Sequence, residues 1–85
     1  MNYVISAHAE DELIIRNIPR KLLEKTLNEP QHVIASGESR VIHQSKVLID
    51  GRYFLLRVVT AHATDAPVVV TVYRTTKIRK YWKAE

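Results

Sequence analysis

Cysteine is absent from this 85-residue sequence, and so is any long hydrophobic run. Without cysteine, the chain has no disulfide framework, no thiolate nucleophile and no zinc–thiolate site. No apolar stretch approaches the roughly 18 residues that are needed to span a bilayer. No signal-peptide pattern opens the sequence. We therefore expect a soluble, cytoplasmic protein without a membrane partner.

Metal-binding patterns are missing as well. The sequence has four histidines, but neither an HExxH-like pair nor a carboxylate cluster suited to a metal ion. We therefore expect no metal site and no cofactor. His43 is expected to be structural, because it falls on the sheet face that we predict to be buried, whereas His32 and His62 fall near strand ends.

The length and the charge balance define one small, basic domain. We assign residues 1–85 to a single domain, because a chain of this length has no room for a second core. The 13 Lys and Arg exceed the 9 Asp and Glu, which gives a net charge of +4. Five basic residues but only one acidic residue lie from Arg74 onward. This excess favours an acidic partner such as nucleic acid, an acidic protein surface or anionic lipid.

Two short helices are expected before an antiparallel sheet. Ser6 is suited to cap the first helix, and Pro19 is suited to the first turn of the second. After residue 30 the apolar period changes to two, which predicts strands over 31–36, 40–49 and 52–61 and a last strand from Pro67. Asp50-Gly51 predicts a type I′ hairpin turn. The fold class is therefore α+β, with about four antiparallel strands. The apolar stripes of the two helices are Ile5, Ala9 and Leu13, then Leu22, Leu23, Thr26 and Leu27.

The hairpin register assigns each strand residue to one face of the sheet. One face is more apolar and is expected to pack on the helices. The other places Gln44 opposite Arg57, with Lys46 one diagonal step away, and leaves them on an open side. The residues predicted for the helix face are Val41, His43, Ser45, Val47, Ile49, Phe54, Leu56 and Val58, joined by Val68, Val70 and Val72. Those predicted to join Arg57 on the open side are Thr71, Tyr73 and Thr75.

The open face suits phosphoryl chemistry. Lys46 and Arg57 would hold a phosphate and stabilise the added charge of its transition state, and Tyr73 or a histidine would transfer the proton. RNA supplies its own nucleophile in the 2′-hydroxyl, so neither a metal nor a covalent intermediate is needed. The alternative is that Lys46 and Arg57 only keep an exposed sheet face soluble.

The C-terminal segment combines cations with aromatic rings, as proteins that hold phosphates and unstacked bases do. One interpretation is a nucleic-acid-binding tail that leaves the sheet edge; the other is a solvated tail whose Tyr81 and Trp82 cover the edge of the core. The nucleic-acid-binding candidates are Arg74, Thr75, Lys77, Arg79 and Lys80.

Four short segments carry a resemblance that spans nearly the whole chain. They are Ile5-Ser6-Ala7-His8-Ala9, Arg16-Asn17-Ile18, Leu56-Arg57-Val58-Val59 and Val70-Thr71-Val72-Tyr73-Arg74-Thr75. Together they resemble a family of uncharacterised bacterial domains related to the RelE, ParE and BrnT toxins. The resemblance implies a RelE- and barnase-like fold, with two helices packed on a curved antiparallel sheet. It also implies cleavage of free or ribosome-bound RNA, or ParE-like inhibition of DNA gyrase, and an antitoxin that covers the basic groove.

The resemblance assigns the strand arginine to Arg57 and the polar end of the last strand to Tyr73 and Thr75. Lys46 matches basic strand residues by position only. His8 is the family-typical histidine, although we place it in the first turn of the helix layer, behind the opposite sheet face. A packing role is one interpretation of His8 there; the other is that it reaches a groove at the sheet edge. Glu12 stands where the family often has an arginine.

These observations favour a toxin-like, metal-independent ribonuclease that uses Arg57, Tyr73, Lys46 and His8. Its expected partners are RNA or the ribosome and a cognate antitoxin. Two alternatives stay open: a non-catalytic protein- or nucleic-acid-binding module derived from a toxin, and a gyrase inhibitor.

Overall fold

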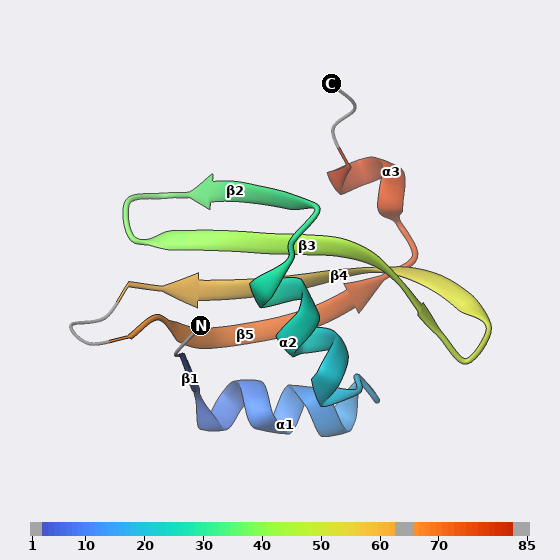
Figure 1. Cartoon of the computed structure of the whole chain (residues 1–85), viewed down its shortest axis with the longest axis horizontal. Coiled ribbons are helices and arrows are strands. Elements are labelled where there is room, and N and C mark those ends of the chain that lie inside the picture. The colour runs from blue at the N-terminus through green and yellow to red at the C-terminus, as the bar shows by residue number, and fades with distance from the viewer. Residues whose placement is uncertain (1–2, 63–65, 83–85) are drawn as a thin grey trace.

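The computed structural model describes residues 3–62 and 66–82, which form an α+β domain (Figure 1). The sheet has five strands in the order β1-β5-β4-β3-β2. α1 lies alongside β5, and α2 crosses β3 and β4. In chain order the elements are β1 (Val4–Ile5), α1 (Ala7–Ile15), α2 (Arg20–Asn28), β2 (His32–Ser36), β3 (Arg40–Ile49), β4 (Arg52–Ala61), β5 (Val68–Thr75) and α3 (Ile78–Tyr81).

The expectation of about four, wholly antiparallel strands is wrong, because β1 adds a fifth strand that is parallel to β5. The strand was missed because two residues are too short to show an alternating pattern. Ile5 therefore belongs to β1 and not to the helix stripe. The pairing is fixed by two backbone hydrogen bonds, from Val4 N to Pro67 O and from Ser6 N to Val69 O, each 3.0 Å long.

The cap of α1 and the central hairpin follow the sequence, whereas Pro19 is the N-cap of α2 and not part of its first turn. Ser6 is the N-cap of α1, and its hydroxyl accepts a hydrogen bond from Ala9 N at 3.1 Å. Asp50 and Gly51 both have positive φ angles, 51° and 76°, as a type I′ turn requires. The predicted register is confirmed, because Ile49 pairs with Arg52 at the turn.

A β-bulge in β5 changes which valines enter the core. Val59 pairs with Thr71 but Thr60 pairs with Val69, so Val70 has no partner of its own in the ladder. An extra residue of this kind reverses the alternation of side chains beyond it. Val69 is consequently fully buried, whereas Val68 and Val70 are only half-buried. The prediction that Val68, Val70 and Val72 join the core is therefore wrong for Val68 and Val70 and confirmed for Val72.

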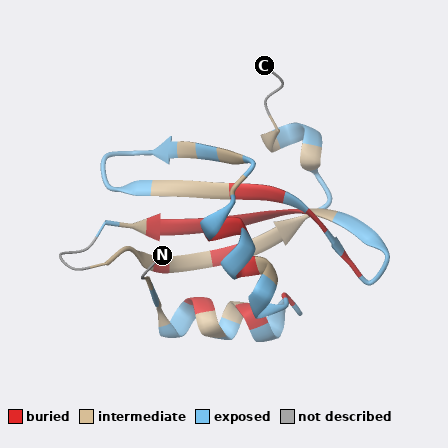
Figure 2. Cartoon of the chain, viewed as in Figure 1, coloured by how far each residue is buried: buried red, intermediate tan, exposed pale blue. Residues whose placement is uncertain are grey.

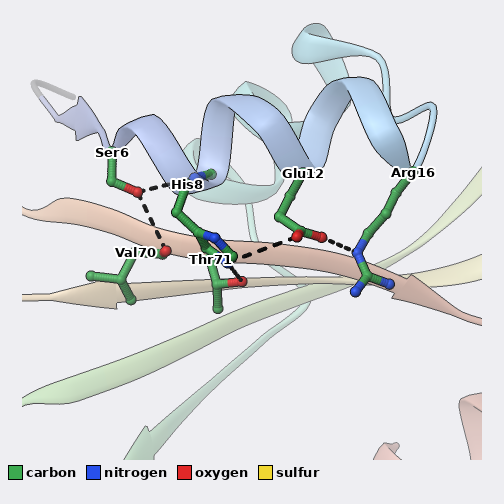
Figure 3. Close-up of polar contacts among 7 residues, drawn as sticks. Ser6, His8, Glu12, Arg16, Val70 and Thr71 are labelled. Carbon is green, nitrogen blue, oxygen red and sulfur yellow. Dashed lines mark hydrogen bonds and ion pairs between the residues drawn. The ribbon is translucent and has the colours of Figure 1, made fainter.

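The bulge also joins the sheet to α1. The Ser6 hydroxyl donates a hydrogen bond to Val70 O at 3.3 Å (Figure 3). One side chain thus caps the helix and satisfies a carbonyl of the bulge, which explains how the start of α1 is held against β5.

The core lies between the two longer helices and the sheet face that the sequence predicted for it. Buried residues follow β4 along most of its length, while β2 and α3 contain none (Figure 2). The core cluster consists of Ala9, Leu13, Ile18, Leu23, Leu27, Val47, Ile49, Leu56, Val58, Val69 and Val72. The helix-facing side of the hairpin is therefore confirmed.

The basic tail expected to leave the sheet edge folds differently. Residues Ile78–Tyr81 form α3, and this short helix lies against the second face of the sheet through Tyr81 and Trp82. The residue Lys83, which belongs to the same basic segment, falls outside the described residues.

Replacing Ser6 by alanine is expected to lower the free energy of unfolding by about 1–2 kcal/mol, because the cap and the bond to the bulge are lost together. Urea denaturation measures the change. The matched control is Ser36→Ala at the exposed end of β2, which is expected to change stability by less than about 0.5 kcal/mol. Equal losses in the two variants would contradict the dual role of Ser6.

His43 gives the fold a defined pH dependence. It lies on the helix side of β3, with Nε2 3.3 Å from Thr60 Oγ1, and burial lowers its pKa below the ordinary 6.5. Below 6.5 the unfolded chain therefore binds more protons than the folded chain, so stability falls as the pH decreases. We expect His43→Gln to reduce this loss between neutral pH and about pH 5. The control is His62→Gln at an exposed position, which should keep the loss of stability at low pH. If the free energy of unfolding changes equally with pH in both variants and the wild type, His43 is not the source of the loss.

Candidate functional site

Arg57 occupies the centre of the second sheet face, between Gln44 on β3 and Tyr73 on β5. Its Nε donates a hydrogen bond to Gln44 Oε1 at 3.0 Å, and its Nη1 donates to the Tyr73 hydroxyl at 2.5 Å. The predicted juxtaposition of these three residues is therefore confirmed. The prediction of an open face is wrong at this point, because Arg57 is only 7% exposed beneath α3.

The buried guanidinium of Arg57 has no carboxylate partner among the residues that the structure describes. Its charge is balanced by polar and aromatic groups instead. The guanidinium carbon lies 4.2 Å from the ring centre of Tyr81 and 5.7 Å from that of Tyr73. Cation–π contacts of this kind contribute about 2 kcal/mol when water is excluded. The site is thus a buried cation that is surrounded by polar and aromatic groups.

Gln44 connects Arg57 to the C-terminal helix. The side chain is fully buried, and its Nε2 donates to Tyr81 O at 3.1 Å and lies 3.2 Å from His32 Nδ1. Because an amide nitrogen only donates, His32 Nδ1 accepts this bond. The sequence places Gln44 opposite Arg57, but we predicted no role for it. The feature that could have indicated a role is an uncharged polar residue at a central position of a strand.

A stack of His32, Trp82 and Lys46 borders the same site. The rings of His32 and Trp82 are 3.9 Å apart with an angle of 26° between their planes. Lys46 Nζ lies 4.1 Å from the centre of the Trp82 ring. Lys46 is thus on the predicted face, whereas His32 was missed, because its position near a strand end gave no reason to pair it with the C-terminus.

His8 lies at the other end of this face, at the edge formed by β5. Its side chain is exposed, and its Nε2 is 3.4 Å from Thr71 Oγ1 and 3.8 Å from Glu12 Oε1 (Figure 3). Thr71 and Tyr73 lie two residues apart on the same face of β5. His8 thus belongs to the helix layer, as expected, and its ring reaches the edge of the face that carries Arg57.

Glu12 is engaged by a basic residue that sequence reasoning did not assign. Arg16 donates a hydrogen bond from Nε to Glu12 Oε2, and this bond lowers the pKa of the Glu12 carboxyl (Figure 3). His8, Glu12 and Arg16, the C-cap residue of α1, thus form one row along the helix. Their spacing of four residues was the available signal.

The predicted nucleic-acid-binding residues separate into two groups. Arg74 pairs with Leu56, so it lies on the helix face, where its guanidinium carbon is 4.4 Å from the Phe54 ring centre. Thr75 caps the next turn by accepting a hydrogen bond from Lys77 N at 3.1 Å. The exposed cations near α3 are Lys77, Arg79 and Lys80. Thr75 pairs with Leu55, two residues before Arg57, and therefore lies on the Arg57 face as predicted.

Within the described part of the chain, no group of three or more His, Cys, Asp or Glu side chains is placed to hold a metal ion. None of the described helices is long and apolar enough to cross a membrane.

The fold and the site define a small α+β domain with a mixed five-stranded sheet and a basic, aromatic cluster on one face. The chain belongs to the family described as "Domain of unknown function (DUF4258)", which matches residues 5–74. No curated protein and no solved structure matches the chain. The family match includes His8, Lys46, Arg57 and Tyr73 but ends before α3.

Replacing Gln44 by methionine, which has a similar shape, is expected to destabilise the fold by about 1–3 kcal/mol. The reason is that Arg57 Nε and the Tyr81 carbonyl oxygen each lose a hydrogen-bond partner away from solvent. Urea denaturation provides the measurement. Gln31→Met, at an exposed position, is the control and is expected to lower the free energy of unfolding by less. A Gln44 variant as stable as the control would show that the network does not hold α3 in place.

Proposed function

We propose that this chain is a toxin-like, RNA-cleaving domain with a RelE/barnase-like arrangement of its helices and sheet. One observation carries the proposal: the buried Arg57 guanidinium has hydrogen-bond and aromatic partners but no described carboxylate. A buried cation without a counter-charge is costly, and a phosphodiester would supply the missing charge. Guanidinium groups bind phosphate through directed, charge-assisted hydrogen bonds.

The proposed reaction is intramolecular transesterification of RNA. The 2′-oxygen attacks the adjacent phosphorus, the bond to the 5′-oxygen breaks, and the products carry a 2′,3′-cyclic phosphate and a 5′-hydroxyl. Arg57 would stabilise the charge that develops on the phosphoryl oxygens. Gln44 and Tyr73 hold the guanidinium group of Arg57 in a fixed orientation, so it needs to move little when a phosphate replaces the Tyr81 ring.

The proposal gives proton transfer to two groups. The Tyr73 hydroxyl touches Arg57 directly, and His8 lies beside Thr71 on the same strand as Tyr73. Imidazole is the side chain that most often transfers protons in catalysis, and His8 Nε2 lies 3.8 Å from Glu12 Oε1. We assign proton removal from the 2′-hydroxyl to His8 and donation to the leaving oxygen to Tyr73.

The remaining parts of the proposal follow from this activity. A cytoplasmic ribonuclease would need restraint, and a cognate antitoxin would supply it by covering the basic side of the domain. RNA, either free or on the ribosome, would be the substrate. The cations of Lys77, Arg79 and Lys80 would attract it electrostatically.

A second candidate is a non-catalytic nucleic-acid- or protein-binding module. The observation that favours it is the closure of the site, because Tyr81 and Gln44 already satisfy Arg57 in the absence of a ligand. Such a module would bind RNA or an acidic protein without cutting RNA. The cleavage test below distinguishes the two functions.

We expect purified wild-type protein to cleave single-stranded RNA in the presence of EDTA and Arg57→Lys to do so roughly 10²–10³-fold more slowly, because lysine keeps the charge but loses the fork. The products should carry 2′,3′-cyclic phosphates, and growth should arrest when the wild type is induced but not when Arg57→Lys is induced.

Arg52→Lys, a change of the same type at an exposed position of β4, is the matched control and should retain full activity. Cleavage that depends on a divalent metal, or equal rates for the two variants, would contradict the mechanism. RNA binding by a folded wild type that never cleaves would favour the binding module.

A further inference from the structure

The contacts that hold α3 against the sheet are those that a nucleotide makes with protein. Trp82 stacks on His32 and lies under Lys46 Nζ, as an unstacked base lies between an aromatic ring and a cation. The Tyr81 carbonyl oxygen accepts a hydrogen bond from Gln44 Nε2, as a base carbonyl or a phosphate oxygen would. The Tyr81 ring covers the Arg57 guanidinium.

We propose that His32 and Lys46 form a nucleobase-binding slot for single-stranded RNA, and that Trp82 occupies this slot until RNA displaces it. The inference rests on the proposed function and extends it. It places one base of the substrate on His32, next to the phosphate that Arg57 binds. Gln44 lies between the two positions and contacts both His32 and Arg57.

The attachment of α3 is limited enough for displacement. The helix has four residues, none of which is buried, and it contributes no side chain to the core cluster. It also lies beyond the family match, which ends at residue 74, whereas His32, Gln44, Lys46 and Arg57 lie within it. The slot is thus part of the family domain, and its cover is a separate C-terminal element.

Displacement predicts an unusual effect of removing Trp82. A ligand that binds only the open form has its affinity reduced by the fraction of molecules that are open. Trp82→Ala removes the competing ring, so we expect tighter binding of a fluorescein-labelled, single-stranded 2′-O-methyl oligonucleotide, by about tenfold. This probe resists cleavage because its 2′-oxygen is methylated, so fluorescence anisotropy reports binding alone.

The base platform is tested in the same background. Adding His32→Ala to Trp82→Ala is expected to weaken binding by roughly five- to a hundredfold, which is the range for loss of one base stack. Tyr53→Ala is the matched control, because Tyr53 is an aromatic residue of β4 that is 66% exposed, and it should leave the affinity unchanged. Circular dichroism confirms that each variant is folded.

Trp82 also reports its own release, because it is the single tryptophan of the chain. In the wild type, the unlabelled oligonucleotide should move its emission to longer wavelength as the ring leaves His32 for water. Binding with unchanged emission would overturn the inference, and so would Trp82→Ala with weaker or equal affinity, since the ring would then be either a base platform itself or irrelevant to the slot.

These outcomes separate the slot from the ribonuclease activity. Tighter binding by Trp82→Ala without any RNA cleavage by wild type would support the slot and refute the ribonuclease. Metal-independent cleavage by wild type, together with unchanged affinity of Trp82→Ala, would support the ribonuclease and refute the slot.

Discussion

The second face of the sheet is organised around one buried cation. Arg57 lies at the middle of the central strand β4, and the strand register gives it Gln44 on one side and Tyr73 on the other. Since no described carboxylate neutralises it, these neighbours have to supply acceptors and aromatic faces. Gln44 in turn is held by His32 and by the Tyr81 carbonyl. The position of α3 therefore depends on the same guanidinium that the proposed chemistry needs.

One face of the sheet holds most of the apolar core, and the other holds the residues of the proposed chemistry. The helix face buries valines, leucines and isoleucine against α1 and α2, and burial of this kind is the main source of folding free energy. The opposite face carries the polar network and contributes little apolar contact beyond Leu55 and Val59. Residues such as Tyr73 and Arg57 can consequently be selected for ligand binding, because the fold depends chiefly on the other side. The bulge at Val70 is where the two requirements meet, since it turns Val69 inward and leaves Thr71 beside His8.

Local signals predicted some of this arrangement and not the rest. The Asp50-Gly51 turn fixes the register of β3 and β4, and the period-two alternation then places Gln44 opposite Arg57 without reference to distant residues. The bulge has no such signal, because Val68, Val69 and Val70 are identical side chains, and only the pairing with β4 decides which enters the core. β1 depends on contact between the two ends of the family domain. The packing of Trp82 on His32 joins residues far apart in the sequence, and the residues around either position do not predict this contact.

The energetic balance of α3 explains why a cover and a binding slot are compatible. Ordering each residue costs about 1–2 kcal/mol of conformational entropy, whereas α3 is held by one backbone-directed hydrogen bond, one ring stack and cation–π contacts. Gains and costs of this size are similar, so the proposed slot requires only a small free-energy difference between the closed and open forms. A phosphodiester gives Arg57 charge-assisted hydrogen bonds, which are roughly twice as strong as neutral ones, and its base replaces the Trp82 ring on His32. RNA would thus recover the closed-state contacts and also neutralise the buried charge, which no part of α3 does.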